Sequence, residues 1–276
     1  MIAPSPSNFV DIKGVSLVYG VKEKTKALDD LNMAIAAGHF VAVVGPSGCG
    51  KSSLMKLVSG LRPPTSGTIE VAGQRIDGPL KMVGMAFQNP TLLPWRRTIS
   101  NVMLPMEIVE PHRHTFRADR KVHEARALAL LKSVGLEGFA TKYTWQLSGG
   151  MQQRASLCRA LIHEPSLLML DEPFGALDAF TREELWDVLQ AVWMERKCTT
   201  ILVTHDLREA VYLADKVFVM SARPGRIVAT FDVSFERPRR PEIAFDPAFT
   251  DIVHHLREQI RHQRQAPDAT GTGGVL

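Results

Sequence analysis

The segment Gly45–Ser52 constrains the fold of this chain more than any other stretch, because it matches the pattern G-x-x-x-x-G-K-[ST]. It follows a five-residue apolar run, Phe40–Val44, that suits a strand buried on both faces, and it precedes a helix-compatible stretch, Ser52–Ser59. Glycines in such a loop let successive backbone N–H groups converge on a phosphate at the start of a helix. Lys51 would then lie against the β- and γ-phosphates of a nucleotide, and the Ser52 hydroxyl would bind Mg²⁺. The alternative interpretation is an ordinary glycine-rich turn.

A second motif, Leu167–Glu172, is an apolar strand that ends in two carboxylates. Ligands bind at the carboxyl ends of the strands of a parallel sheet, which is where these two acids would lie. Asp171 is predicted to hold Mg²⁺, directly or through water, and Glu172 to polarise the water that attacks the γ-phosphate. Taken alone, the motif fits a solvated acidic turn better. Together with the phosphate loop, it favours the catalytic interpretation.

Hydrophobic periodicity predicts an α/β fold that is interrupted by a helical part. Strands are predicted at Phe9–Tyr19, Ala27–Ile35, Phe40–Val44, Met82–Phe87, Leu167–Leu170, Thr200–Val203, Val217–Met220 and Arg226–Phe231, with a hairpin region at Thr65–Ala72. Helices are predicted at Val122–Leu131, Arg182–Glu195, Leu207–Ala214 and Pro247–Arg264. We therefore assign residues 1–88 and 162–232 to an α/β core and residues 89–161 to an inserted helical subdomain. Residues 233–276 are assigned to a C-terminal helix and a disordered tail.

Composition narrows the class of protein. The chain carries 33 basic and 29 acidic side chains, and a net charge of +4 is too small to indicate a nucleic-acid binder by itself. No uninterrupted apolar run exceeds five residues, whereas a membrane-spanning helix needs about 20, and no signal peptide is visible. Three cysteines without paired spacing exclude a disulfide framework. We therefore expect a soluble protein of a reducing compartment.

Two groups of aromatic side chains invite other interpretations. His112, His114 and His123 lie in a locally basic stretch without cysteines and with few acids, so a solvated helical face is expected in preference to a metal site. Trp186 and Trp193 are seven residues apart on one predicted helix and are expected in the core.

The segment Leu147–Arg154 supplies a second place where an anion could bind. Ser148 is a plausible helix N-cap, and Gly149 and Gly150 expose backbone amides at the start of that helix. One nucleotide does not need two such cradles. The second is therefore predicted to serve a nucleotide that is held by another copy of the chain.

These motifs, in this order, resemble those of the ATP-binding subunits of ABC transporters over about Phe9–Phe231. Leu147–Arg154 matches the signature segment of that family. Gln88 lies at the Q-loop position, Gly175–Asp178 match the D-loop, and His205 lies at the switch-histidine position. The resemblance implies a P-loop ATPase core with an antiparallel β region and an inserted α-helical subdomain.

The resemblance also implies a set of site residues. Tyr19 would stack on adenine, and the nucleotide would be contacted by Tyr19, Gly45, Pro46, Ser47, Gly48, Cys49, Gly50, Lys51, Ser52, Ser53, Ser148, Gly149, Gly150 and Asp178. The residues implied in catalysis are Glu172, His205 and Gln88, and those implied in binding Mg²⁺ are Ser52, Gln88 and Asp171.

The mechanism that the resemblance implies is a head-to-tail homodimer that closes around two ATP molecules and reopens after hydrolysis. Such a motor would act at the cytoplasmic face of the plasma membrane on a separately encoded permease, and indirectly on an extracytoplasmic solute-binding protein. The predicted permease contact is Asn89–Trp95, where two leucines lie between two prolines and a tryptophan follows the second proline. Ordinary local packing explains that segment equally well.

Thr91–Trp95 and Ser221–Val228 are similar to the importers of nitrate, alkanesulfonates, taurine and related small solutes. The competing hypothesis is an ATPase of the same superfamily that acts on nucleic acid or ribosomes. Such proteins carry coiled-coil arms, zinc clusters or two fused copies, none of which is found in this sequence, so no nucleic-acid partner is expected. The transported solute is not encoded in residues that contact only nucleotide and permease.

Overall fold

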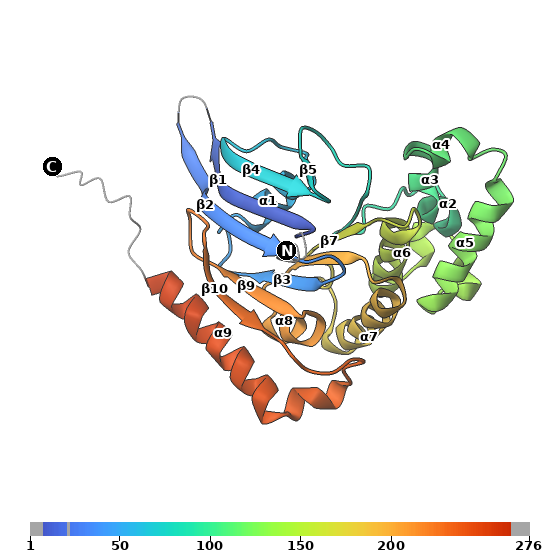
Figure 1. The fold of residues 1–276 in the computed structure, drawn as a ribbon. Coiled ribbons are helices and arrows are strands. Elements are labelled where there is room, and N and C mark those ends of the chain that lie inside the picture. The colour runs from blue at the N-terminus through green and yellow to red at the C-terminus, as the bar shows by residue number, and fades with distance from the viewer. Residues whose placement is uncertain (1–7, 21–22, 266–276) are drawn as a thin grey trace, which may run out of the picture.

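The computed structural model describes residues 8–20 and 23–265. The predicted disordered tail from Ala266 onward lies outside the described residues. Figure 1 shows an antiparallel sheet, a second sheet beneath it, a group of helices at one side and a long helix near the C-terminus.

The central sheet has six strands in the order β10-β9-β3-β8-β7-β6. Its strands are β3 (Phe40–Val44), β6 (Val83–Phe87), β7 (Leu167–Asp171), β8 (Thr199–Val203), β9 (Lys216–Met220) and β10 (Ile227–Asp232). The five strands from β9 to β6 run parallel, and β10 joins the edge antiparallel to β9. The parallel sheet confirms the α/β prediction and brings the carboxyl ends of β3, β6, β7 and β8 to one edge.

The second sheet is antiparallel, in the order β2-β1-β4-β5. It consists of β1 (Val10–Tyr19), β2 (Thr25–Ile35), β4 (Ser66–Val71) and β5 (Gln74–Arg75). Helix α1 (Lys51–Val58) packs with its apolar side in the same hydrophobic cluster as the two sheets. The antiparallel region and its hairpin are therefore confirmed.

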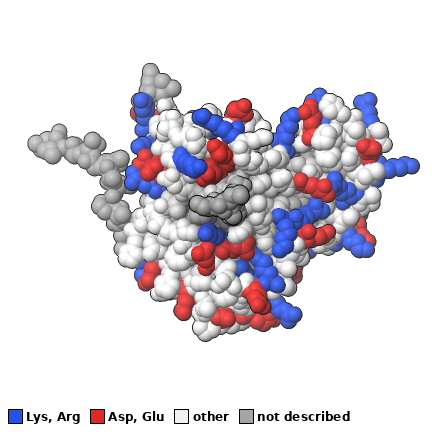
Figure 2. Space-filling view, in the orientation of Figure 1, with Lys and Arg blue, Asp and Glu red and all other residues white. Residues whose placement is uncertain are grey.

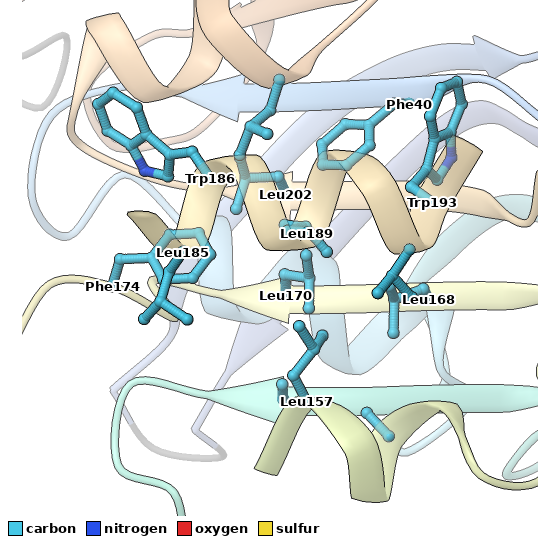
Figure 3. Packing of buried hydrophobic residues seen from close by; sticks show 14 of the residues in the cluster. Phe40, Leu157, Leu168, Leu170, Phe174, Leu185, Trp186, Leu189, Trp193 and Leu202 are labelled. Atoms are coloured by element: carbon cyan, nitrogen blue, oxygen red, sulfur yellow. The ribbon is translucent and has the colours of Figure 1, made fainter. Parts of the chain in front are cut away.

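Burial on both faces explains why the parallel strands are continuously apolar. Phe40, Ala42 and Val44 belong to one hydrophobic cluster, whereas Val41 and Val43 belong to the other. Successive side chains of a strand point to opposite faces, so each of these residues is buried in turn. Figure 3 shows the helix-covered face, where Leu168 and Leu170 lie beside Leu185 and Leu189 of the covering helix.

Helices occupy the interrupting segment, as predicted. They are α2 (Thr98–Val102), α3 (Leu104–Ile108), α4 (His112–Thr115), α5 (Arg120–Ser133) and α6 (Gly149–Leu161), with short 3-10 turns η1 (Glu137–Phe139) and η2 (Thr144–Gln146). The expectation of a solvated histidine face was wrong for His123, which is only 5% exposed. Its ring stacks on Phe116 with 5.7 Å between ring centroids, and its two ring nitrogens are buried without a hydrogen-bond partner among the described residues.

The last part of the chain returns to the central sheet. It contains α7 (Ala179–Arg196), α8 (Leu207–Leu213), the 3-10 turn η3 (Pro241–Phe245) and α9 (Pro247–Gln265). Trp186 and Trp193 of α7 are buried, as predicted. Helix α9 confirms the C-terminal helix and lies alongside α8 in Figure 1. No helix in the described ranges has the length and apolarity needed to cross a membrane.

Candidate nucleotide-binding site

The phosphate loop connects β3 to α1 at the carboxyl edge of the central sheet. Gly50 precedes α1 with φ +106°, and a Cβ placed on it would lie 2.7 Å from Cδ2 of Leu28 and 3.0 Å from the carbonyl oxygen of Ala27. Both the left-handed backbone and the lack of space require glycine at this position. Gly50 therefore sets the turn from the phosphate loop into α1.

The Lys51 side chain is buried against this loop, with 7% of its surface exposed. Its Nζ donates hydrogen bonds to the carbonyl oxygens of Gly45 at 3.0 Å and Pro46 at 3.1 Å. An ammonium group can only donate hydrogen bonds. The two carbonyl oxygens that accept them therefore hold the positive charge of Lys51 against the phosphate loop. That charge lies where the sequence predicts contact with phosphate.

Cys49 occupies the interior side of the loop. The thiol is 1% exposed, and burial raises its pKa above the ordinary value for cysteine. Only a thiolate is strongly nucleophilic, so this side chain packs against the core as an unreactive apolar group. The predicted contact of Cys49 with a nucleotide would come from its backbone.

Tyr19, at the end of β1, lies beside the loop and α1. Its hydroxyl is 3.1 Å from Oγ of Ser53, and the guanidinium of Arg62 lies 4.3 Å from the centroid of its ring. Arg62 therefore covers one face of the ring. The predicted stacking of adenine on Tyr19 would use the ring face that Arg62 leaves open.

Asp171 is the last residue of β7, between Phe87 of β6 and Val203 of β8. Burial raises the pKa of its carboxyl, while a hydrogen bond from Ser52 acts in the opposite direction. The structure thus joins two of the three residues predicted to bind Mg²⁺. A hydroxyl and a carboxylate are hard oxygen donors, which fit Mg²⁺.

Glu172 and His205, predicted as catalytic residues, are in direct contact. Nδ1 of His205 lies 3.1 Å from Oε2 of Glu172, and the His205 side chain is exposed. The Glu172 backbone is left-handed, with φ +48°, and its N–H donates to the carbonyl oxygen of Val203 at 2.8 Å. A left-handed glutamate costs about 1 kcal/mol or more, so the surrounding strands hold this carboxylate in a conformation it would not otherwise adopt.

Gln88 follows β6 and is exposed beside the D-loop segment. A Cβ placed on Gly175 would lie 3.1 Å from Nε2 of Gln88, so the two residues are close neighbours. Sequence reasoning missed a second glutamine, Gln153 of α6, whose Nε2 donates to the carbonyl oxygen of Phe87 at 2.9 Å. Gln153 thus links α6 to the residue before Gln88. The only feature of the sequence that could have pointed to Gln153 is its position within the signature segment.

The signature residues lie on the surface at the start of α6. Ser148 caps that helix, as predicted, by accepting a hydrogen bond from the N–H of Met151 at 3.3 Å. A Cβ on Gly149 would meet no atom within 4 Å, and one on Gly150 would lie 2.7 Å from Cγ2 of Thr181. The described residues include no hydrogen bond from Ser148–Gly150 to the phosphate loop of the same chain.

Asp178 lies in the loop before α7 and caps that helix. Its carboxylate accepts hydrogen bonds from the backbone N–H of Thr181 at 3.0 Å and from its hydroxyl at 2.7 Å. Together these hydrogen bonds lower the pKa of the Asp178 carboxyl. The structure does not bring Asp178 together with the phosphate loop.

The backbone of the segment Asn89–Trp95 is held by one fully buried and one half-buried side chain that the sequence did not single out. The fully buried Asn101 side chain accepts a hydrogen bond from the N–H of Leu93 at 2.6 Å and donates to its carbonyl oxygen at 3.1 Å. Arg159 donates to the carbonyl oxygen of Pro90 at 2.6 Å. Trp95 is 70% exposed, so the backbone of the segment is fixed while its largest apolar side chain faces solvent.

Charged side chains of both signs are mixed over the face drawn in Figure 2. This agrees with the small net charge of the sequence. The described ranges contain no group of three or more His, Cys, Asp or Glu side chains that could hold a metal ion. A bound Mg²⁺ would therefore depend on Ser52 and Gln88, and on phosphate oxygens, as well as on Asp171.

Comparison with known protein families and sequences gives one consistent result. The family model described as "ABC transporter" matches residues 28–175. The taurine import ATP-binding protein TauB of Escherichia coli (strain K12) is 38% identical over 257 residues, covering 91% of this chain and 98% of that protein. The aliphatic sulfonates import ATP-binding protein SsuB of Bacillus licheniformis is 44% identical over 216 residues, covering 78% of this chain and 81% of its own.

Solved structures that are similar to this chain are also ABC cassettes. The dimeric structure of a post-hydrolysis state of the ATP-binding cassette MJ0796, bound to ADP and Pi, has a TM-score of 0.68 and 29% identity. It covers 82% of this chain and 100% of that chain. The structure of cbiO1 from Clostridium perfringens, part of the ABC transporter complex cbiONQ, has a TM-score of 0.70 and 27% identity, covering 93% of this chain and 98% of that one.

Proposed function

The chain belongs to the ABC transporter family, and on that premise we propose that it is the ATP-hydrolysing motor of an importer for a small sulfonate-class solute. The solute class comes from the two import proteins above, whose names specify taurine and aliphatic sulfonates. Residues 1–88 and 162–232 would form the ATPase core, residues 89–161 the signature subdomain, and residues 233–276 a C-terminal appendage.

The observation that carries the proposal is the contact between Glu172 and His205 at the sheet edge that also carries the phosphate loop. A carboxylate that follows directly on a strand of a nucleotide fold is placed to accept a proton from water as that water attacks the γ-phosphate. His205 would hold the Glu172 carboxylate in position and hydrogen-bond the γ-phosphate. Lys51 would neutralise charge on the β- and γ-phosphates as the terminal P–O bond breaks.

Mg²⁺ would be held by Ser52 and Asp171, with Gln88 contributing to the surrounding shell of oxygen ligands. When bound, it neutralises phosphate charge. The contact between Ser52 and Asp171 supports this assignment, because both present oxygen donors on the phosphate-loop side of β7.

Two copies would complete each site. Ser148–Gly150 are on the surface and make no hydrogen bond to the phosphate loop within the described chain, so they are free to contact a nucleotide held by a second copy. Asp178 would lie at the contact between the copies. The dimeric state of the similar cassette MJ0796 supports this arrangement.

The motor would act on a separate permease at the cytoplasmic face of the plasma membrane, with an extracytoplasmic binding protein delivering the solute. The segment Asn89–Trp95 would bind the permease. Its backbone is fixed and its tryptophan is exposed, so this tryptophan could become buried as an anchor in the interface with the permease. Replacing Trp95 by alanine should release the chain from a multi-spanning protein that co-purifies from membranes. A purely cytosolic complex with nucleic acid would contradict the import proposal.

The activity itself is tested by replacing Glu172 with glutamine. The variant should bind ATP as the parent does, lose about 10²–10⁴-fold in turnover, and accumulate as an ATP-bound dimer. Glu195, an exposed residue near the end of α7, provides the matched control, and Glu195→Gln should keep the parent rate. Turnover near the parent rate in Glu172→Gln would overturn the assignment of the base.

A further inference from the structure

A cleft of about 310 Å³ lies between the phosphate loop and the C-terminal helix. Its walls come from three separate parts of the chain and include Ser47, His205, Leu207, Arg257, Ile260 and Arg261. Leu207 and Ile260 supply apolar surface, while Arg257 and Arg261 supply guanidinium groups. The cleft therefore combines polar groups of the phosphate loop and His205 with two apolar side chains and two guanidinium groups.

Helix α9 is anchored so that these arginines remain available. Phe249, Val253 and Leu256 face the core and are buried, whereas Arg257 and Arg261 are exposed on successive turns. Neither arginine forms a salt bridge within the described residues. A guanidinium that has no carboxylate partner retains its capacity to bind an acceptor or to stack on an aromatic ring.

Phe180 is a second feature that the fold of a single chain does not explain. It lies in the first turn of α7, two residues after Asp178, and is 84% exposed. The turn that carries it is fixed, since Arg182 forms an ion pair with Asp206 at 2.8 Å. Asp206 directly precedes Leu207, a residue of the cleft, yet Phe180 is not among the residues lining the cleft of its own chain.

We propose that Phe180 of one copy inserts into the cleft between the phosphate loop and α9 of a second copy. The proposal rests on the proposed homodimer, in which the phosphate loop and Asp178 lie at the contact between the copies. A two-fold dimer requires a self-complementary surface, with the projecting residue and the receiving cleft on the same face of one chain. The pairing of Arg182 with Asp206 places the helix start that carries Phe180 beside the loop that leads to the cleft.

The cleft offers an aromatic side chain both apolar and cationic contacts. Leu207 and Ile260 can take the ring out of water, and a guanidinium packed on its face adds a cation–π contact. His205 borders the same cleft and also contacts Glu172. The inserted ring would therefore connect closure of the dimer to the histidine that positions the proposed base.

The test measures dimer affinity with ATP in the Glu172→Gln background by sedimentation equilibrium. Because two identical contacts are lost, Phe180→Ala should weaken the dimer by on the order of 100-fold, with unchanged ATP binding to the monomer. Arg257→Ala combined with Arg261→Ala should weaken it in the same direction. Phe245, 85% exposed on η3, provides the matched control, and Phe245→Ala should leave dimer affinity unchanged.

A cross-link between copies tests the contact directly. Phe180→Cys on one copy and Arg261→Cys on a differently tagged copy, both with Cys198→Ser, should form a cross-linked pair only with ATP. The two cysteines are on separate chains, so a link within one chain cannot give this product. Phe245→Cys in place of Phe180→Cys should give none.

The outcomes separate the two proposals. A Glu172→Gln parent that never dimerises overturns the proposed dimer, and with it this contact. A dimer that forms normally with Phe180→Ala and gives no cross-link overturns the contact alone. Protection of Arg257 and Arg261 from phenylglyoxal by inorganic phosphate, without protection on dimerisation, would identify the cleft as an anion site and contradict the proposal.

Discussion

Replacing Glu209 by glutamine should stabilise the protein at neutral pH and have much less effect in acid. Glu209 is on α8, four residues after His205, and only 3% of its surface is exposed. The Thr204 hydroxyl donates to Oε2 at 2.9 Å, while Oε1 has no partner among the described residues. Burial raises the pKa of this carboxyl from 4.5 to about 8, and the neighbouring Asp206 adds to the effect.

The magnitude follows from proton linkage. Between the two pKa values the folded state holds a proton that the unfolded state has released, so stability falls by about 1.4 kcal/mol for each pH unit. The parent should therefore lose about 3 kcal/mol between about pH 5 and about pH 7 from this group alone. The loss is complete above the folded pKa, and it vanishes below the pKa of the unfolded chain.

The assay is urea denaturation of the parent and of Glu209→Gln across this pH range. Glutamine keeps an acceptor for the Thr204 hydroxyl but carries no proton to lose, so the gain in stability should rise from about pH 5 to about pH 8. Glu195→Gln is the control, since an exposed carboxyl should show no such trend. A gain in stability that is the same at about pH 5 and at about pH 8 would contradict a raised pKa of Glu209 in the folded protein.

Two substitutions and one labelling experiment test how the site is built. Asn101→Ala should cost about 2–4 kcal/mol of stability in urea denaturation, because the fully buried Asn101 side chain would no longer hydrogen-bond the backbone of Leu93, Arg96 and Arg97, and equal stability would contradict this. Gly50→Ala should fold less stably and should lose ATP binding measured by calorimetry, because its φ of +106° and the close contacts leave no room for a Cβ. Cys49 should react with iodoacetamide more slowly than the half-buried Cys198, as peptide mass spectrometry of labelled protein would show, and faster labelling of Cys49 would disprove its burial.

The sequence predicted the parts of the fold in which local pattern and burial agree. The apolar run Phe40–Val44 became β3 because both faces of the sheet are covered, and Gly50 forced the turn that follows. Ser148 and Asp178 each cap a helix by accepting a hydrogen bond from a backbone N–H three residues later. Because such a contact is local, the sequence could predict the cap at Ser148 without tertiary information. The cap at Asp178 was not predicted, but the same local contact explains it.

Long-range contacts determine the positions of residues that local sequence patterns could not predict. His123 was expected in solvent, but Phe116 and the packing of α5 bury it. Glu209 has the polarity of a surface residue, yet α8 turns it into the interior, where Thr204 can reach it. Arg257 approaches the phosphate loop only because α9 folds back along α8, and no local spacing contains that information.

In the proposed dimer each ATP site is shared between two copies, and mixing two inactive variants tests this sharing. Lys51→Ala disables the phosphate loop, and Gly149→Glu disables the signature with little effect on the fold, because no atom lies within 4 Å of a Cβ at Gly149. Each variant alone should be inactive. In an equal mixture, half of the dimers pair an intact phosphate loop with an intact signature at one of their two sites, so up to about a quarter of the parent ATPase rate should return. A mixture no more active than the two variants measured separately would contradict the shared site.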